Sequence, residues 1–105
     1  MAQSGSQYHE AEEKLTASTK EMHRALKSLM EELEAVDWYQ QRVDATEDPE
    51  LRAVLMHNRD EELEHAAMVL EWLRRNNSKV DEMLRKYLFT EGDITKIEKN
   101  AKAHD

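Results

Sequence analysis

The chain of 105 residues contains no cysteine, one proline, two glycines and one phenylalanine. The lack of cysteine excludes disulfide scaffolds, cysteine-type zinc sites and thiol nucleophiles. So little proline and glycine leaves few means of building loops and hairpins. No apolar run approaches the roughly 18 residues that a membrane-spanning helix needs, and the start MAQSGSQ lacks the apolar segment of a secretion signal. We therefore expect a cytoplasmic protein with no membrane partner.

Acidic residues outnumber basic residues in this sequence. Fifteen Lys and Arg face 23 Asp and Glu, a net charge of −8, so nucleic acid is excluded as a partner and cations are favoured. Only 39% of residues are hydrophobic and 36% are charged. This composition is typical of long charged helices that need apolar cover from a second copy of themselves.

The helical pattern predicts two long helices. Residues 1–7 are expected to be disordered, and the first helix is expected to start between Tyr8 and Leu15 and to end near Val43, roughly 40 to 50 Å further on. Asp48 suits an N-cap and Pro49 suits the first position of a second helix. That helix is expected to end near Arg75, where Asn76-Asn77 offers a left-handed stop.

A short third helix comes next in the pattern. Ser78 is expected to cap it, with Asp81 as a weak capping-box partner, and it is expected to reach Phe89. Thr90-Glu91-Gly92-Asp93 should break it, and Ile94 and Ile97 mark one or two further turns. The prediction is an all-α fold: an antiparallel helical hairpin with a short C-terminal helix, spanning residues 8–98 before a polar tail at residues 99–105. Its four-helix bundle would form only by dimerisation.

One short motif, Glu62-Leu63-Glu64-His65, places two metal ligands on one helical face. A chain with this many Glu and His contains about one such pair by chance, so position matters more than the motif. Glu62, His65 and Asn58 lie within the apolar stripe of the second helix, and Glu32 lies within that of the first. The first stripe is Leu15, Met22, Ala25, Leu26, Leu29, Leu33, Val36 and Val43; the second is Leu51, Val54, Leu55, Ala66, Val69, Trp72 and Leu73.

Burying carboxylates costs several kcal/mol unless they are neutralised, paired or bound to metal. Oxygen and imidazole ligands without thiolate suit iron, manganese or zinc. A di-iron bundle takes one Glu from each of two helices and a Glu-x-x-His from each of the other two. Glu32, Glu62 and His65 are half of that set. Two chains related by a two-fold axis would complete both the bundle and a metal site.

Three further groups of residues stand out beside these ligands. His57, Glu61 and Glu64 share a face beside the stripe and form either a looser cation site or a solvated charged face. Glu31, Glu34 and Trp38 lie away from the stripe of the first helix. An exposed Trp among acids suggests a second protein contact, and one symmetric contact plus a different one builds rings or cages. Tyr39, at the stripe edge, is either a redox neighbour of the site or an ordinary aromatic.

Four segments resemble the encapsulated ferritins: MEELEAVDWY (residues 30–39), HNRDEELEHA (57–66), LEWLRR (70–75) and YLFTE (87–91). The similarity covers about residues 9–98. It implies a ferroxidase whose two-helix subunits dimerise around a di-iron centre, with Glu32, Glu62 and His65 as ligands from each chain. It also implies a ring of five dimers inside an encapsulin nanocompartment that stores iron.

The same resemblance assigns roles to the outer residues. It implies that Glu31 and Glu34 lie along a metal access route and that His57, Glu61 and Glu64 form an outer metal-attracting site. We expect that zinc, manganese or calcium can also occupy the metal sites in vitro. Members of this family usually continue into a C-terminal shell-targeting peptide, and we expect this peptide to be absent or truncated in this chain.

Two other functions are compatible with the residues. The chain could be a non-catalytic helical module that only dimerises or binds a partner, its buried acids paired with each other or protonated. It could also hold a structural zinc or manganese ion without oxidase activity. Metal analysis together with an oxygen electrode separates these from the ferroxidase.

Overall fold

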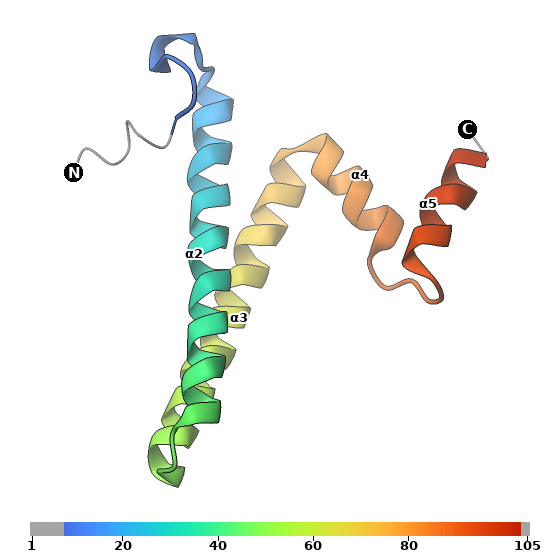
Figure 1. Ribbon diagram of the computed structural model, residues 1–105. Coiled ribbons are helices and arrows are strands. Elements are labelled where there is room, and N and C mark those ends of the chain that lie inside the picture. Colours follow the sequence, from blue (N-terminus) through green and yellow to red (C-terminus); the bar gives the residue numbers. More distant parts are fainter. Residues whose placement is uncertain (1–7, 104–105) are drawn as a thin grey trace. The chain divides into compact units, whose positions relative to one another are not determined.

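The structure is a computed structural model that describes the backbone of residues 8–103 and the side chains of residues 8–98. This part of the chain forms, in order, η1 (Glu12–Lys14), α2 (Ala17–Ala45), α3 (Pro49–Asn76), α4 (Ser78–Tyr87) and α5 (Ile94–Ala103) (Figure 1). No strand occurs in the described backbone, so the all-α prediction is confirmed. The chain divides after Leu70 into two compact units. The disorder expected of residues 1–7 lies outside the described residues.

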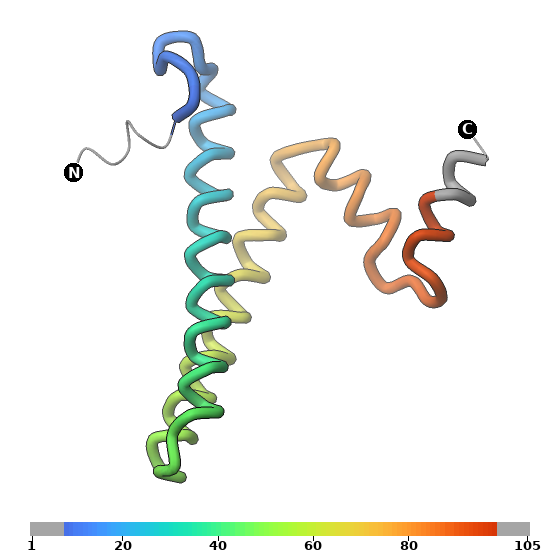
Figure 2. The backbone as a smooth tube through the Cα atoms, viewed as in Figure 1, coloured from blue at the N-terminus to red at the C-terminus, as the bar shows by residue number. Residues whose placement is uncertain are grey.

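The first unit is a helical hairpin. Figure 2 shows α2 and the beginning of α3 running side by side in opposite directions, which confirms the predicted pair of long antiparallel helices. Asp48 caps α3, because its Oδ1 accepts the N–H of Glu50 at 3.0 Å. At the turn, the Arg52 guanidinium donates to the carbonyl of Val43 at 3.2 Å and to that of Thr46. Arg52 thereby ties α3 to the end of α2, where carbonyls lack helical partners.

The start of α2 differs from the expectation. The helix begins at Ala17, not between Tyr8 and Leu15, because Leu15 has an extended backbone and the Thr16 hydroxyl accepts the N–H of Thr19 at 3.1 Å. Such a cap needs non-helical dihedrals at its own position and so sets the first turn. With 29 residues, α2 is about 43 Å long, within the expected range. The preceding segment folds back on it, and the Tyr8 and His23 rings lie 4.9 Å apart.

Apolar cover inside the chain is sparse. Among the side chains that the structure describes, Val43, Ala66 and Leu73 are the only buried apolar ones. Many large apolar residues stay exposed: Leu26, Met30, Leu33, Trp38, Leu51, Val54, Met56, Leu63, Met68, Trp72, Leu88, Phe89 and Ile94. No helix within residues 8–103 is both long and apolar enough to cross a bilayer.

The second unit starts with the last turns of α3. Arg74 donates to both carboxylate oxygens of Glu71 at 2.8 Å and to Asp81 on α4, while Arg85 donates to the same Asp81 oxygen at 2.9 Å. These bonds place the start of α4 against the end of α3. They also explain why Asp81 does not act as the capping-box partner that the spacing suggested: its carboxylate is engaged by two arginines.

The first and last residues of α4 differ from the sequence-based expectation. Asn77, not Ser78, caps α4: its side chain accepts the N–H of Val80 at 2.9 Å. Its φ of −146° is extended, so it is not a left-handed stop; an N-cap requires that extended backbone. The helix ends at Tyr87, two residues before Phe89, which takes a left-handed φ of 60°.

The last helix is longer than expected. After a turn in which Gly92 takes a φ of 85°, Asp93 Oδ1 accepts the N–H of Thr95 at 2.9 Å and opens α5. The helix then continues to Ala103 through residues expected to form a polar tail. Lysine, glutamate and alanine favour helix, and no glycine or proline interrupts them.

Candidate metal centre

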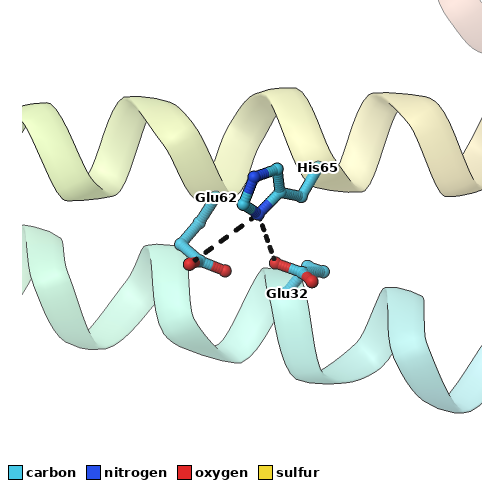
Figure 3. Close-up of side chains that lie close together, drawn as sticks. All are labelled: Glu32, Glu62 and His65. Atoms are coloured by element: carbon cyan, nitrogen blue, oxygen red, sulfur yellow. Dashed lines mark ion pairs between the residues drawn. The ribbon is translucent and has the colours of Figure 1, made fainter.

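Three side chains from the two long helices meet between them. Glu32 lies at the middle of α2, while Glu62 and His65 lie one turn apart on α3 and therefore share a face (Figure 3). All three belong to the apolar stripes through which the helices pack, so the packing itself brings them together. The structure thus brings together the three residues that the sequence analysis selected.

The geometry is that of a small ligand cluster. One ligand atom from each residue lies within 4.8 Å of the other two. The Nδ1 atom of His65 is 3.5 Å from Oε2 of Glu32 and 3.9 Å from Oε1 of Glu62 (Figure 3). Within the described residues, no other group of three or more His, Asp and Glu side chains gathers in this way.

The cluster has an excess of negative charge. The neighbouring Glu32 carboxylate and partial burial raise the pKa of Glu62, and His65 opposes them only in part. The Oε2 atom of Glu32 is buried and has no hydrogen-bond partner. A buried oxygen left without a donor is costly, and a cation coordinated there would satisfy it.

The donor set fits a divalent metal ion. Carboxylate and imidazole donors without thiolate suit iron, manganese and zinc, and a bound cation would relieve both the repulsion at Glu62 and the unsatisfied Glu32 oxygen. The site is also open on one side. The side chains of Glu32 and Glu62 are each 25% exposed, and that of His65 is 49% exposed. Further ligands or substrate can therefore reach it from outside the hairpin.

The other candidate residues lie outside this cluster. The Nε2 atom of His57 is 3.9 Å from Oε1 of Glu61, but both are well exposed, and Glu64 forms no three-ligand group with them within the described side chains. Glu31 and Glu34 are exposed on α2.

The two aromatic residues that the sequence singled out have distinct surroundings. Trp38 is half exposed and lines a shallow pocket of about 440 Å³ with Gln41, Arg42 and Ala45. Tyr39 is half-buried, and the Arg42 guanidinium lies 5.4 Å from its ring centroid. The Arg42 contact was not predicted.

Comparison with known protein families gives a match over most of the chain: the EncFtn-like family model matches residues 7–91. The chain belongs to the EncFtn-like family. The resemblance to the encapsulated ferritins is therefore confirmed, and the matched range contains the whole cluster.

Individual relatives agree with the family assignment. This EncFtn-like chain is 67% identical over 98 residues to an encapsulated ferritin-like protein of Rhodospirillum rubrum, covering 93% of this chain and 70% of the relative. It is 60% identical over 92 residues to a ferritin-like protein of Thermotoga maritima, covering 88% and 81%. A shorter match, 39% over 56 residues, covers 52% of this chain and 43% of the encapsulin nanocompartment cargo protein EncC of Myxococcus xanthus.

A solved structure supports the fold. A crystal structure of a Nitrosomonas europaea protein superposes on this EncFtn-like chain with a TM-score of 0.79 at 57% sequence identity, covering 83% of this chain and 96% of the other.

Sequence reasoning missed one set of polar residues beside the cluster. Arg59 on α3 donates from Nη1 to Oε1 of Gln40 on α2 at 2.8 Å and also bonds the neighbouring Asp60. The available signal was the spacing of Arg59, one helical turn before Glu62. The bond to Gln40 could not be read from the sequence, because it depends on how the two helices are aligned.

Proposed function

We propose that this chain is a ferroxidase that oxidises Fe²⁺ to Fe³⁺ with O₂ at a di-iron centre shared by two copies. The observation that carries the proposal is the Glu32, Glu62 and His65 cluster, in which a buried carboxylate oxygen lacks a donor and the ligands stay partly open to the outside. Membership of the EncFtn-like family supports an iron-related role.

A second copy would complete the site. Three protein ligands are half of the carboxylate and histidine set of a ferritin-like di-iron bundle. The apolar stripes that carry them are incompletely covered: Leu33 on α2 and Val54 on α3 are each 51% exposed. A two-fold axis beside the cluster would bury these residues and supply the same three ligands again. Four carboxylates and two divalent cations then balance in charge, which favours simultaneous assembly and metal binding.

In this proposal, iron is the substrate and the side chains bind and position it. Glu32 and Glu62 attract and hold Fe²⁺, and His65 completes the protein's share of ligands. Each Fe²⁺ gives up one electron. Two electrons and two protons convert O₂ to hydrogen peroxide, and four of each convert it to two waters. The apolar stripe around the carboxylates limits water and strengthens their hold on cations.

The outer acids are proposed to serve the same substrate. Glu31 and Glu34 are exposed, acidic and close in sequence to Glu32, so they are suited to guide Fe²⁺ to the centre. His57, Glu61 and Glu64 would form a looser outer site. Tyr39 and Trp38 are proposed as neighbours of the centre.

The proposed partner is an encapsulin shell. One relative is an encapsulin nanocompartment cargo protein and another is an encapsulated ferritin-like protein. We infer that this chain works inside such a shell in the cytoplasm, as a ring of five dimers, and that the shell holds the ferric mineral. A ring of short subunits has no closed cavity of its own.

The direct test adds Fe²⁺ aerobically and follows ferric absorbance together with O₂ uptake. The Glu32→Ala, Glu62→Ala, His65→Ala triple variant should oxidise iron no faster than buffer. A control variant with Glu47→Ala and Glu91→Ala, two exposed acids that do not belong to the cluster, should match wild type. A triple variant as fast as wild type would sink the proposal. Metal bound without O₂ uptake would instead indicate a structural zinc or manganese site.

Assembly gives an independent test of the shared centre. Native mass spectrometry with and without Fe²⁺ under anaerobic conditions should show metal shifting monomer toward dimer or ring. Identical distributions in both conditions would contradict a site formed between two copies.

A further inference from the structure

Arg59 lies where it could neutralise the metal centre. It precedes Glu62 by three residues on α3, and side chains at that spacing are neighbours on a helix surface. Its side chain is only 20% exposed. A guanidinium binds a carboxylate with two parallel hydrogen bonds, so an Arg59 turned toward Glu62 would occupy the oxygens that a metal ion needs.

In the structure, Arg59 forms hydrogen bonds with Asp60 and Gln40. Its Nε and Nη2 atoms donate to Oδ1 of Asp60 at 3.1 and 3.0 Å, and its Nη1 donates to Oε1 of Gln40 at 2.8 Å. Gln40 in turn donates to Oδ1 of Asp44 at 3.1 Å, which orients its amide oxygen toward Arg59. Within the described residues, Arg59 pairs with Asp60 and not with Glu62.

Gln40 and Arg59 lie on the same side of the cluster along the two antiparallel helices. Gln40 lies about two turns beyond Glu32 along α2, and Arg59 lies about one turn before Glu62 along the antiparallel α3. The two offsets differ by about one turn, roughly 7 Å, and the long Arg59 side chain spans this difference to reach Gln40.

We propose that Asp60 and Gln40 hold Arg59 away from Glu62 and so keep the carboxylate pair free for a divalent cation. Both are positioning residues that act through Arg59. The inference rests on the proposed function, because it gives a role to these residues only if the cluster binds metal. A released guanidinium would weaken metal binding in two ways: by pairing with Glu62 and by repelling the incoming cation.

The test measures Co²⁺ affinity of the full chain from visible absorbance, with no dependence on turnover. The Gln40→Ala, Asp60→Ala double variant removes both acceptors of Arg59 and should bind Co²⁺ about tenfold more weakly than wild type, roughly the effect of one competing charge at this partly exposed site. Adding Arg59→Gln to the double variant should restore the affinity to within about twofold, since the competitor is gone. Asp44→Asn is the matched control: it removes one acid from the same network but keeps an amide oxygen that can accept from Gln40, so Arg59 should stay held and Co²⁺ should bind as it does to wild type.

A merely structural role predicts a different pattern. If Arg59 only clamps the helices, the triple variant should bind as weakly as the double variant or worse, and that result would overturn the inference. Unchanged affinity in the double variant would overturn it too. Asp60→Ala alone carries little risk to folding because the side chain is 65% exposed, and it should weaken Co²⁺ binding by less than the double variant does, since Gln40 still accepts from Arg59. Far-UV circular dichroism checks the helices in each variant. If wild type binds no Co²⁺, the proposed function is overturned as well. If wild type binds Co²⁺ but the variants do not behave as expected, only the role given to Arg59 is wrong.

Discussion

Replacing Glu62 with Gln should stabilise the metal-free chain and remove its response to metal. Ligand atoms of Glu32 and Glu62 lie within 4.8 Å of each other. Two unit charges at 4.8 Å repel by about 3.5 kcal/mol at an effective dielectric constant of about 20. Both side chains are a quarter exposed, so water screens much of this repulsion, and we expect a gain of about 1 kcal/mol from the neutral amide.

The gain should depend on pH in a defined direction. The Glu32 carboxylate and partial burial raise the pKa of Glu62 in the folded chain, so the folded state holds this proton more tightly than the unfolded state does. Stability of the metal-free wild type should therefore fall as pH rises from the ordinary carboxyl pKa through the raised value. The advantage of Glu62→Gln should be full above that window and should vanish at lower pH, where Glu62 is protonated in both states.

Metal should reverse the order of stability. A ligand at one hundred times its Kd stabilises the folded state by about 2.7 kcal/mol, and wild type should receive this gain while Glu62→Gln receives little of it. The assay is thermal unfolding at one fixed protein concentration, in EDTA and in Co²⁺. In EDTA the variant should melt about 4–8 °C higher than wild type, and in Co²⁺ it should melt lower. Glu47→Gln, at an exposed acid in the connection between α2 and α3, is the control for loss of charge. A variant that is less stable than wild type in EDTA at neutral pH would refute the reasoning.

Other predictions concern assembly and the second unit. Leu33→Asp places a charge on a half-exposed stripe residue, so sedimentation should show a shift toward monomer, and unchanged assembly would contradict the proposed contact face. Hydrogen bonds from Arg74 and Arg75 lower the pKa of Glu71 to about 2, so the stability that Glu71 contributes should be present above the unfolded value of 4.5 and lost as pH falls toward 2. Arg74→Gln should move that pKa upward in an NMR titration; an unmoved value would exclude Arg74 as the main cause. Asn77→Ala removes the side-chain cap of α4 and should cost about 1 kcal/mol of stability in denaturant unfolding. Equal midpoints for this variant and wild type would show that the cap contributes nothing.

Local chemistry explains which element boundaries were predictable. The Asp48 cap and Pro49 start of α3 depend on side-chain and backbone properties at those positions alone, and both were predicted. The prediction for Asn77 was wrong because an asparagine at this place can either stop one helix or cap the next. The immediate start of α4 required the extended backbone of a cap.

The cluster of Glu32, Glu62 and His65 was predictable for a different reason. An α-helix turns by about 100° per residue, so a carboxylate or imidazole inside an apolar stripe must point at the packing partner. Glu32, Glu62 and His65 could therefore be selected before any coordinates. Their burial was overstated, since His65 is 49% exposed in the single chain. Side chains on a stripe are covered only where a partner helix reaches them, and the hairpin supplies only one.

The sequence by itself determined the helical class, the hairpin and the three candidate ligand residues, because periodicity and capping act within a few residues of one another. Only the tertiary structure decided that the Glu32 oxygen lies buried without a donor and that Arg59 turns to Gln40 and Asp60 and not to Glu62. These outcomes depend on the alignment of two helices whose contacting residues are far apart in the chain. That alignment is set by the packing of many side chains together, and no local pattern records it.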